Sequence, residues 1–150
     1  MSASPSDHDA LSIVHPAAWP KARGYVNGML TAGQGERVLF IAGQIGWEPD
    51  CTFTTDDLGE QFVKALDNVL AVVQAAGGAT SSIARMTIYV TDLQAYRERT
   101  QMIGLAWRKR LGKHYPTMAL LGVAGLLEPR AKVEIEATCV LPRAAVGGGE

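Results

Sequence analysis

The sequence predicts a single α+β domain, in which a mixed β-sheet carries two helices on one face. Apolar residues alternate with polar ones in several short segments, and they recur at helical spacing in two longer segments. These segments follow one another in the order β-β-α-β-α-β-β, and a chain of 150 residues has the size of one domain. We expect the domain to cover residues 11–142, between disordered polar tails at 1–10 and 143–150.

The first part of the domain predicts a β-hairpin. Leu11–Val14 can form a short edge strand, which the His15-Pro16 and Trp19-Pro20 pairs then end, because proline cannot donate to a strand ladder. Two further strands, Tyr25–Thr31 and Arg37–Gln44, flank a glycine-containing turn and together form the hairpin.

The clearest helix of the chain follows the hairpin. Thr55 or Asp56 can cap its N-terminus, and acidic side chains in its first turn suit the positive end of the helix dipole. Gly77 and Gly78 end it. One face of this helix is apolar at helical spacing, and its members are Leu58, Phe62, Leu66, Val69, Leu70 and Val73.

A strand over residues 82–91 comes next. We expect Ile83, Arg85, Thr87, Tyr89 and Thr91 to face away from Ala84, Met86, Ile88 and Val90. A strand–helix–strand unit of this length suggests a right-handed crossover between parallel strands. Asp92 then caps a second helix, Leu93–Leu111, which Gly112 stops.

The stretch Tyr115–Ala137 contains two strands joined by a turn near residues 127–130. The first strand runs from Thr117 to Val123, and the second covers about residues 131–140. The second strand alternates strictly, so that one face packs on a core and the face carrying Glu134 meets water or a partner. Because the helices cover only one sheet face, we infer a homo-oligomer that buries the other.

Composition and charge exclude several classes of protein. The formal net charge is −1 without a basic stripe, so we expect no nucleic-acid partner. We expect no membrane contact and a cytoplasmic location, because we find neither a long apolar run nor a signal-peptide pattern. Cys51 and Cys139 lack CxxC spacing, and the three histidines lack metal-ligand spacing, so we expect no disulfide and no metal.

Several short motifs follow one another between Gly24 and Leu141. They are Gly24-Tyr25, LFIAGQI at 39–45, Gln61, LDNV at 66–69, AAG at 75–77, TIYVTDL at 87–93, Tyr115-Pro116 and VEIEA at 133–137. In this order and at these spacings the chain resembles the RidA/YjgF family of reactive-intermediate deaminases, also labelled endoribonuclease L-PSP. The resemblance implies a chorismate-mutase-like fold and a homotrimer with clefts between subunits. It also implies hydrolysis of enamines and imines, such as 2-aminoacrylate, without a metal or organic cofactor.

The resemblance also implies roles for particular residues. The cleft tyrosine of the family matches Tyr25, and its acidic residue near the bound water matches Glu134, so we expect both in a catalytic site. The family's strand serine is Ala42 here, beside the retained Gly43, and its helix asparagine aligns approximately with Thr100. These last three positions are expected to contact substrate.

Met118 stands where the family has the arginine that binds the substrate carboxylate. A two-pronged pair of this kind is worth roughly 1.5–3 kcal/mol, and methionine supplies none of it. The resemblance is therefore to an arginine-lacking branch of the family. We expect little 2-aminoacrylate deaminase activity and a more apolar cleft wall at Met118.

Each candidate also has a structural alternative. Tyr25 could cap an interface, and Glu134 could pair with a nearby basic side chain. Trp47 could wall a pocket for a flat, conjugated substrate or anchor an interface. His114 could titrate near neutral pH beside the substrate, although a lone loop histidine is more often structural.

Together these observations predict a trimeric, cofactor-free deaminase or hydrolase that acts on an enamine, imine or related unsaturated metabolite. The alternative is a non-catalytic trimer that binds or senses a small molecule in the same cleft. Ribonuclease activity ranks last, because the charge balance does not suit a polyanion.

Overall fold

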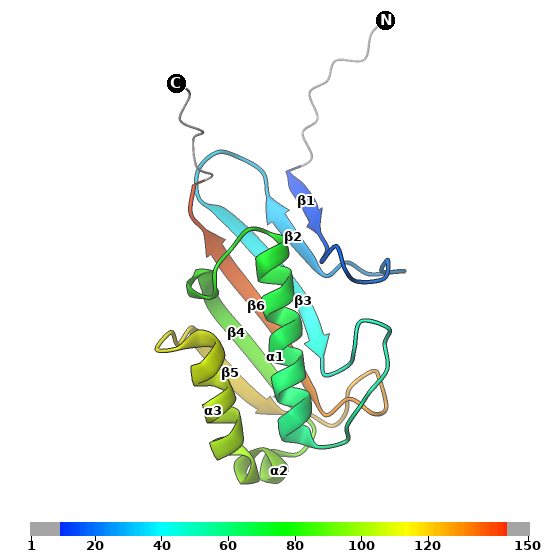
Figure 1. Ribbon diagram of the computed structural model, residues 1–150. Helices are drawn as coiled ribbons and strands as arrows, with labels where there is room; N and C mark the ends of the chain where they lie inside the picture. The colour runs from blue at the N-terminus through cyan, green and yellow to red at the C-terminus, as the bar shows by residue number, and fades with distance from the viewer. Residues whose placement is uncertain (1–9, 144–150) are drawn as a thin grey trace, which may run out of the picture.

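The computed structural model describes residues 10–143, so the predicted tails lie outside the described residues except for Ala10 and Arg143. A six-stranded mixed sheet has the order β1-β2-β3-β6-β4-β5, and the helices lie on one side of it (Figure 1). The strands are β1 Leu11–Val14, β2 Gly28–Thr31, β3 Arg37–Ile45, β4 Ile83–Val90, β5 Thr117–Gly122 and β6 Val133–Leu141. The helices are α1 Leu58–Ala75, α2 Leu93–Glu98 and α3 Thr100–Leu111, with a 3-10 turn at Thr80–Ser82. None of these helices is long and apolar enough to cross a membrane.

The strand pairing confirms the predicted hairpin. It also shows that the last two strands, which a turn was expected to join, do not pair with each other. β2 and β3 pair antiparallel, with Gly28 opposite Ile41. β4 and β5 pair in parallel. The crossover predicted between the strands at 37–44 and 82–91 is confirmed in direction only, because β3 and β4 both run antiparallel to β6. β5 and β6 are not neighbours, because β4 lies between them and pairs with both. β6 also separates β3 from β4, so it is the strand that joins the two halves of the sheet.

Two details of the helices differ from the prediction. Asp57, rather than Thr55 or Asp56, caps α1, because its side chain accepts a hydrogen bond from the Glu60 amide at 3.0 Å. The Thr55 hydroxyl instead accepts a hydrogen bond from the Asp57 amide. The predicted C-terminus is confirmed, since the helix ends before Gly77, which has a φ of +80° that favours glycine.

The predicted second helix is two helices that meet at Arg99. Asp92 caps α2 as predicted, through a hydrogen bond from the Ala95 amide. The Arg99 backbone (φ −109°, ψ 7°) leaves the helical region, and its guanidinium forms an ion pair with Asp57. A methyl group on Gly59 would lie 3.1 Å from the Arg99 side chain, so the chain bends where it passes close to α1.

The alternation of β6 is confirmed and that of β4 holds only in part. Val133, Ile135 and the next alternate residues of β6 are buried, under the helices. In β4 the pairing shifts between Ile83 and Arg85. This irregularity buries Ile83 with Met86 instead of exposing it with Arg85, because an extra residue reverses the side-chain phase.

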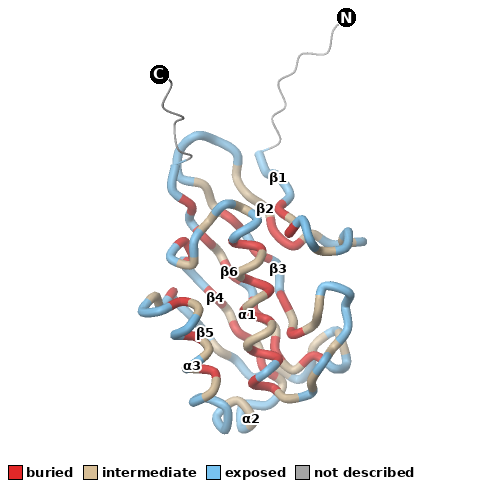
Figure 2. Tube along the Cα trace, viewed as in Figure 1, coloured by how far each residue is buried: buried red, intermediate tan, exposed pale blue. Residues whose placement is uncertain are grey.

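The core lies between α1, α3 and the central strands, where the buried residues are concentrated (Figure 2). The predicted apolar face of α1 forms much of this core, and only Leu70 on that face is partly exposed. Cys139 lies in the same core, and burial raises the pKa of its thiol to about 12. Its thiol is therefore inert at neutral pH, as expected for a small buried strand residue.

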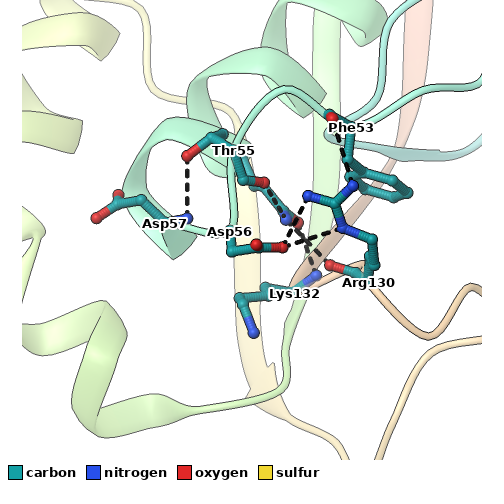
Figure 3. A network of polar contacts seen from close by, with 7 residues as sticks. Phe53, Thr55, Asp56, Asp57, Arg130 and Lys132 are labelled. Carbon is teal, nitrogen blue, oxygen red and sulfur yellow. Dashed lines mark hydrogen bonds and ion pairs between the residues drawn. The ribbon is translucent and has the colours of Figure 1, made fainter.

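Gln61 on α1 connects the helix to two loops. Its fully buried amide donates to the carbonyls of Thr55 and Arg130, both at 3.0 Å, and accepts from the Lys132 amide at 2.8 Å. The Arg130 guanidinium strengthens the same connection through two hydrogen bonds to Asp56 (Figure 3). The loop after β3 and the loop before β6 are therefore held side by side.

We predict that Gln61→Ala lowers the free energy of unfolding by on the order of 3 kcal/mol, because it leaves three backbone groups without their partner. Urea denaturation measures the change. Gln74→Ala, on the exposed end of the same helix, is the matched control and should change stability by less than about 0.5 kcal/mol. Equal effects of the two substitutions would contradict the role of the Gln61 amide.

Candidate functional site

A cavity of about 500 Å³ lies at the end of β3, between the β1–β2 loop, the loop after β3 and the loop before β6. Its size is that of a small-molecule site. Aromatic side chains from two of these loops, Trp19, Tyr25 and Trp47, form part of its wall. Its polar lining consists of two groups, the carboxylates Glu48, Glu128 and Glu134, and the amides Asn27, Gln44 and Asn68.

The floor of the cavity is a break in the β3–β6 ladder. Ile41 pairs with Ala137 and Gln44 with Ile135, so two residues of β3, Ala42 and Gly43, face one residue of β6. Such bulges re-aim side chains and often lie next to functional sites. Here the bulge places the polar end of β3 against the side chain of Glu134 on β6.

Gly43 and Glu134 are in direct contact. A Cβ atom on Gly43 would lie 1.9 Å from Glu134 Oε1 and 2.8 Å from its carboxyl carbon. No other amino acid therefore fits at position 43 unless the Glu134 side chain moves. The glycine is needed for this close approach, which sets where the carboxylate sits in the cavity.

The environment of Glu134 changes its acidity. Partial burial raises the pKa of its carboxyl group, and the nearby charge of Glu136 raises it further. Glu134 therefore holds a proton at higher pH than a free glutamate does. A carboxyl group of this kind is suited to exchanging protons with a water molecule or a substrate.

A chain of hydrogen bonds connects the β1–β2 loop to the floor. His15 Nε2 donates to the Trp19 carbonyl at 3.2 Å, so in the neutral ring Nδ1 accepts from the Asn27 amide at 3.1 Å. Asn27 Oδ1 in turn accepts from Gln44 Nε2 at 3.2 Å. These bonds hold the loop that carries Trp19 and Tyr25 against the end of β3.

A second buried amide fixes the segment that carries Trp47. Asn68 on α1 donates to the carbonyls of Ile45 and Trp47, both at 2.9 Å. The Trp47 ring packs against the Phe53 ring, with the two ring centroids 6.0 Å apart. The Arg130 guanidinium lies over the Phe53 ring, 5.4 Å from its centroid. The position of Trp47 therefore depends on both α1 and the loop before β6.

The structure brings five of the eight predicted site residues together in this cavity: Tyr25, Ala42, Gly43, Trp47 and Glu134. Trp47 lines the cavity, whereas Phe53, which packs against it, does not. Tyr25 is half exposed at the rim, where its hydroxyl group can reach a bound molecule.

The other three predicted residues do not line the cavity within one chain. Met118 lies on the edge strand β5, opposite Met86 and at the far side of the sheet. Thr100 starts α3, and its hydroxyl donates to the Arg97 carbonyl. His114 donates from Nε2 to the Ile83 carbonyl at 2.7 Å, which gives it the structural role of anchoring the start of β4.

Sequence reasoning missed most of the polar lining. Gln44 and Asn68 carried a detectable signal, because each is a polar residue within an otherwise apolar strand or helix face. Trp19 and Glu128 come from loops, whose positions no periodic pattern predicts. Cys51, at a strained φ of +66°, also lines the cavity. Within residues 10–143 no three His, Cys, Asp or Glu side chains are grouped to hold a metal ion.

Comparison with known proteins gives consistent results. The endoribonuclease L-PSP family matches residues 17–141. A RutC family protein of Aquifex aeolicus is 31% identical over 121 residues, which cover 81% of this chain and 94% of that protein. The 2-iminobutanoate/2-iminopropanoate deaminase of Salmonella typhimurium is 28% identical over 106 residues, 69% of this chain and 79% of that protein. The crystal structure of Escherichia coli TdcF with bound serine is 32% identical, with a TM-score of 0.72 over 86% of this chain and 98% of that chain.

The sheet, the helices on one face and the cavity at the end of β3 define an α+β domain with a cavity of small-molecule size. The chain belongs to the endoribonuclease L-PSP family, also called RidA/YjgF. The resemblance seen in the sequence is thereby confirmed.

We predict that Glu134→Gln removes a pH dependence of stability. Because burial raises the pKa of Glu134 in the folded state, its contribution is fully present below its unfolded pKa of about 4.3 and is lost as pH rises through the folded pKa. The substitution should therefore stabilise the protein at neutral pH relative to the parent and have less effect in acid. Urea unfolding from about pH 3.5 to about pH 8 measures this, with the exposed Glu36→Gln as control. Parallel profiles of Glu134→Gln and the parent would contradict the raised pKa.

Proposed function

We propose that this protein is a deaminase-type hydrolase that converts an enamine, imine or related unsaturated metabolite into a carbonyl compound and ammonia without a cofactor. The observation that carries the proposal is the Glu134 carboxyl group, held against Gly43 in a partly buried cavity with a raised pKa. The deaminase name of the Salmonella relative supports the same reaction class.

In the proposed reaction Glu134 moves protons between water and substrate. As a water oxygen bonds to the C=N carbon of a protonated imine, the C=N electron pair moves to nitrogen and Glu134 takes a proton from the water. Glu134 returns that proton to the nitrogen of the resulting carbinolamine. The C–N bond then breaks as the C=O bond forms, and the hydroxyl proton passes through Glu134 to the departing ammonia. One iminium ion and one water thus give one carbonyl compound and one ammonium ion.

The remaining cavity residues position the substrate in this proposal. The hydroxyl group of Tyr25 donates a hydrogen bond at the rim, while Trp47 covers a flat face of the substrate. Ala42 and Gly43 form the floor on which the reacting carbon lies. Ala42 has no hydroxyl group, so in this chain the proton transfers depend on Glu134.

We also propose a homotrimer in which the open sheet face is buried. This face carries exposed apolar side chains on β3, β5 and β6, including Phe40, Leu121 and Val140. Ala42 and Glu134 lie on the same face, so the cavity opens at its end. A neighbouring subunit that covers the face would place its edge strand, with Met118, at the cavity mouth. Met118 would then add an apolar wall where an arginine-bearing relative holds a carboxylate.

A second function has a specific observation in its favour. Ala42 and Met118 both lack the polar groups that the family resemblance assigns to substrate contact, so the cavity can bind a small molecule without turning it over. The protein would then act as a binding or regulatory trimer. We rank RNA cleavage below both functions, because three carboxylates in the cavity would repel phosphate groups.

We predict that Glu134→Gln lowers kcat/KM for imine hydrolysis by about 100-fold or more, because it removes the group that exchanges protons. The rate of imine loss above the spontaneous rate is measured on a panel of enamines and imines generated in situ. Glu36→Gln, on the exposed turn between β2 and β3, should retain the parent rate. Equal rates for Glu134→Gln and the parent would exclude the assigned role. Ligand binding without turnover across the panel would favour the second function.

For the assembly, light scattering should give a mass three times the 16.0 kDa of one chain. Phe40→Asp, at a side chain that is 50% exposed on the open face, should dissociate the trimer, because a buried unpaired charge is costly. Leu105→Asp, at a side chain that is 58% exposed on α3 at the helical side, should leave the mass unchanged. A stable monomer of the parent chain would rule out the interfacial cleft.

A further inference from the structure

The charge of the cavity is unusual for a site that would bind an acid. Three carboxylates line it, whereas no arginine, lysine or histidine of the described residues does. Two basic side chains of the surroundings already have partners. Lys64 Nζ lies 2.9 Å from the carboxylate of Glu48, and Arg130 pairs with Asp56 at 3.0 Å. Lys64 neutralises Glu48, so within one chain a bound carboxylate would meet the charges of Glu128 and Glu134 without a free counter-ion.

Two buried amides add further acceptors. The side chains of Gln44 and Asn68 are only 5% and 4% exposed, and both line the cavity. Each uses its NH₂ group on protein partners: Gln44 donates to the Ala42 carbonyl, and Asn68 donates to the carbonyls of Ile45 and Trp47. Their carbonyl oxygens, Oε1 and Oδ1, accept no hydrogen bond from any residue that the structure describes. These two carbonyl oxygens are therefore free acceptors, which can bind a hydrogen-bond donor of the ligand.

The aromatic wall favours the same kind of ligand. Trp19, Tyr25 and Trp47 line the cavity, and the electron-rich face of a tryptophan or tyrosine ring attracts a cation. Together with the carboxylates, these rings would stabilise a positive charge and leave room for a flat apolar skeleton.

We propose that the cavity selects a cationic nitrogen compound that lacks a carboxylate, namely a protonated imine or amine on a flat, apolar skeleton. The N–H groups of such a ligand would donate to the acceptors of Gln44, Asn68 and the carboxylates. This rests on the proposed function and names its substrate class. The substrate is then the iminium ion derived from an amine rather than from an amino acid, and the reaction that supplies it is the two-electron oxidation of an amine.

Three probes with one skeleton test the charge preference: benzylamine as the cation, benzyl alcohol as the neutral compound and benzoate as the anion. Isothermal titration calorimetry on the full chain should show benzylamine binding at least about 10-fold more tightly than benzoate, with benzyl alcohol between them. Added salt should narrow the difference. Tighter or equal binding of benzoate, or no detectable binding of benzylamine, would overturn the proposal.

Two cavity variants and one control identify the groups responsible. Glu128→Gln should weaken benzylamine and strengthen benzoate, because it removes a negative charge and keeps the shape. Trp47→Leu should weaken benzylamine more than benzyl alcohol, since it keeps an apolar wall but loses the ring. Glu36→Gln lies outside the cavity and should change none of the affinities. Unchanged selectivity in both cavity variants would contradict the assignment.

The binding test and the turnover test have independent outcomes, so each proposal can be rejected without the other. Benzylamine has no C=N bond to hydrolyse, so its affinity is independent of catalysis. If the protein selects cations but hydrolyses no imine, the proposed hydrolase function is wrong and the proposed ligand class stands. If the protein hydrolyses a 2-imino acid faster than the imine of benzaldehyde, the proposed hydrolase function stands and the proposed ligand class is wrong.

Discussion

The buried amide of Gln61 is the interaction on which the cavity depends. It joins α1 to the loop after β3 and to the loop before β6, and all three of its hydrogen bonds go to backbone groups. Packing reinforces this connection, because a Cβ on Gly46 would lie 2.6–2.7 Å from the Gln61 backbone. The end of β3 therefore packs closely against the helix, and the two loops contribute Trp47 and Glu128 to the lining of one cavity.

In the cavity, partial burial and a nearby charge both act on the pKa of the Glu134 carboxyl group. The bulge at Ala42 and Gly43 lets Glu134 lie directly against the β3 backbone, and partial burial with the nearby Glu136 charge raises its pKa. The cavity around it contains acceptors and aromatic rings but, among the described residues, no cation. The same arrangement thus supports a proton-exchanging carboxyl group and a preference for a positively charged ligand.

Much of the fold could be predicted from the sequence because each element carries its own periodicity. The buried face of α1 and the alternation of β6 followed directly from apolar spacing. The errors occurred where a tertiary contact overrides local pattern. The pairing irregularity at Ile83–Arg85 reverses a side-chain phase, and the break at Arg99 lies where the second helical segment passes Gly59 and pairs with Asp57. The separation of β5 from β6 by β4 is likewise a matter of strand order, which spacing does not encode.

For the site, the sequence by itself determined the family, and it predicted Tyr25 and Glu134 as site residues, with Met118 where the resemblance implies an arginine. These are statements about residue identity in a fixed order. Only the tertiary structure decided which residues share a cavity, because loops from three parts of the chain meet there and their positions depend on buried amides rather than on periodicity. It also decided the cavity's charge, since a carboxylate acts on a ligand through its distance from that ligand and not through its place in the sequence.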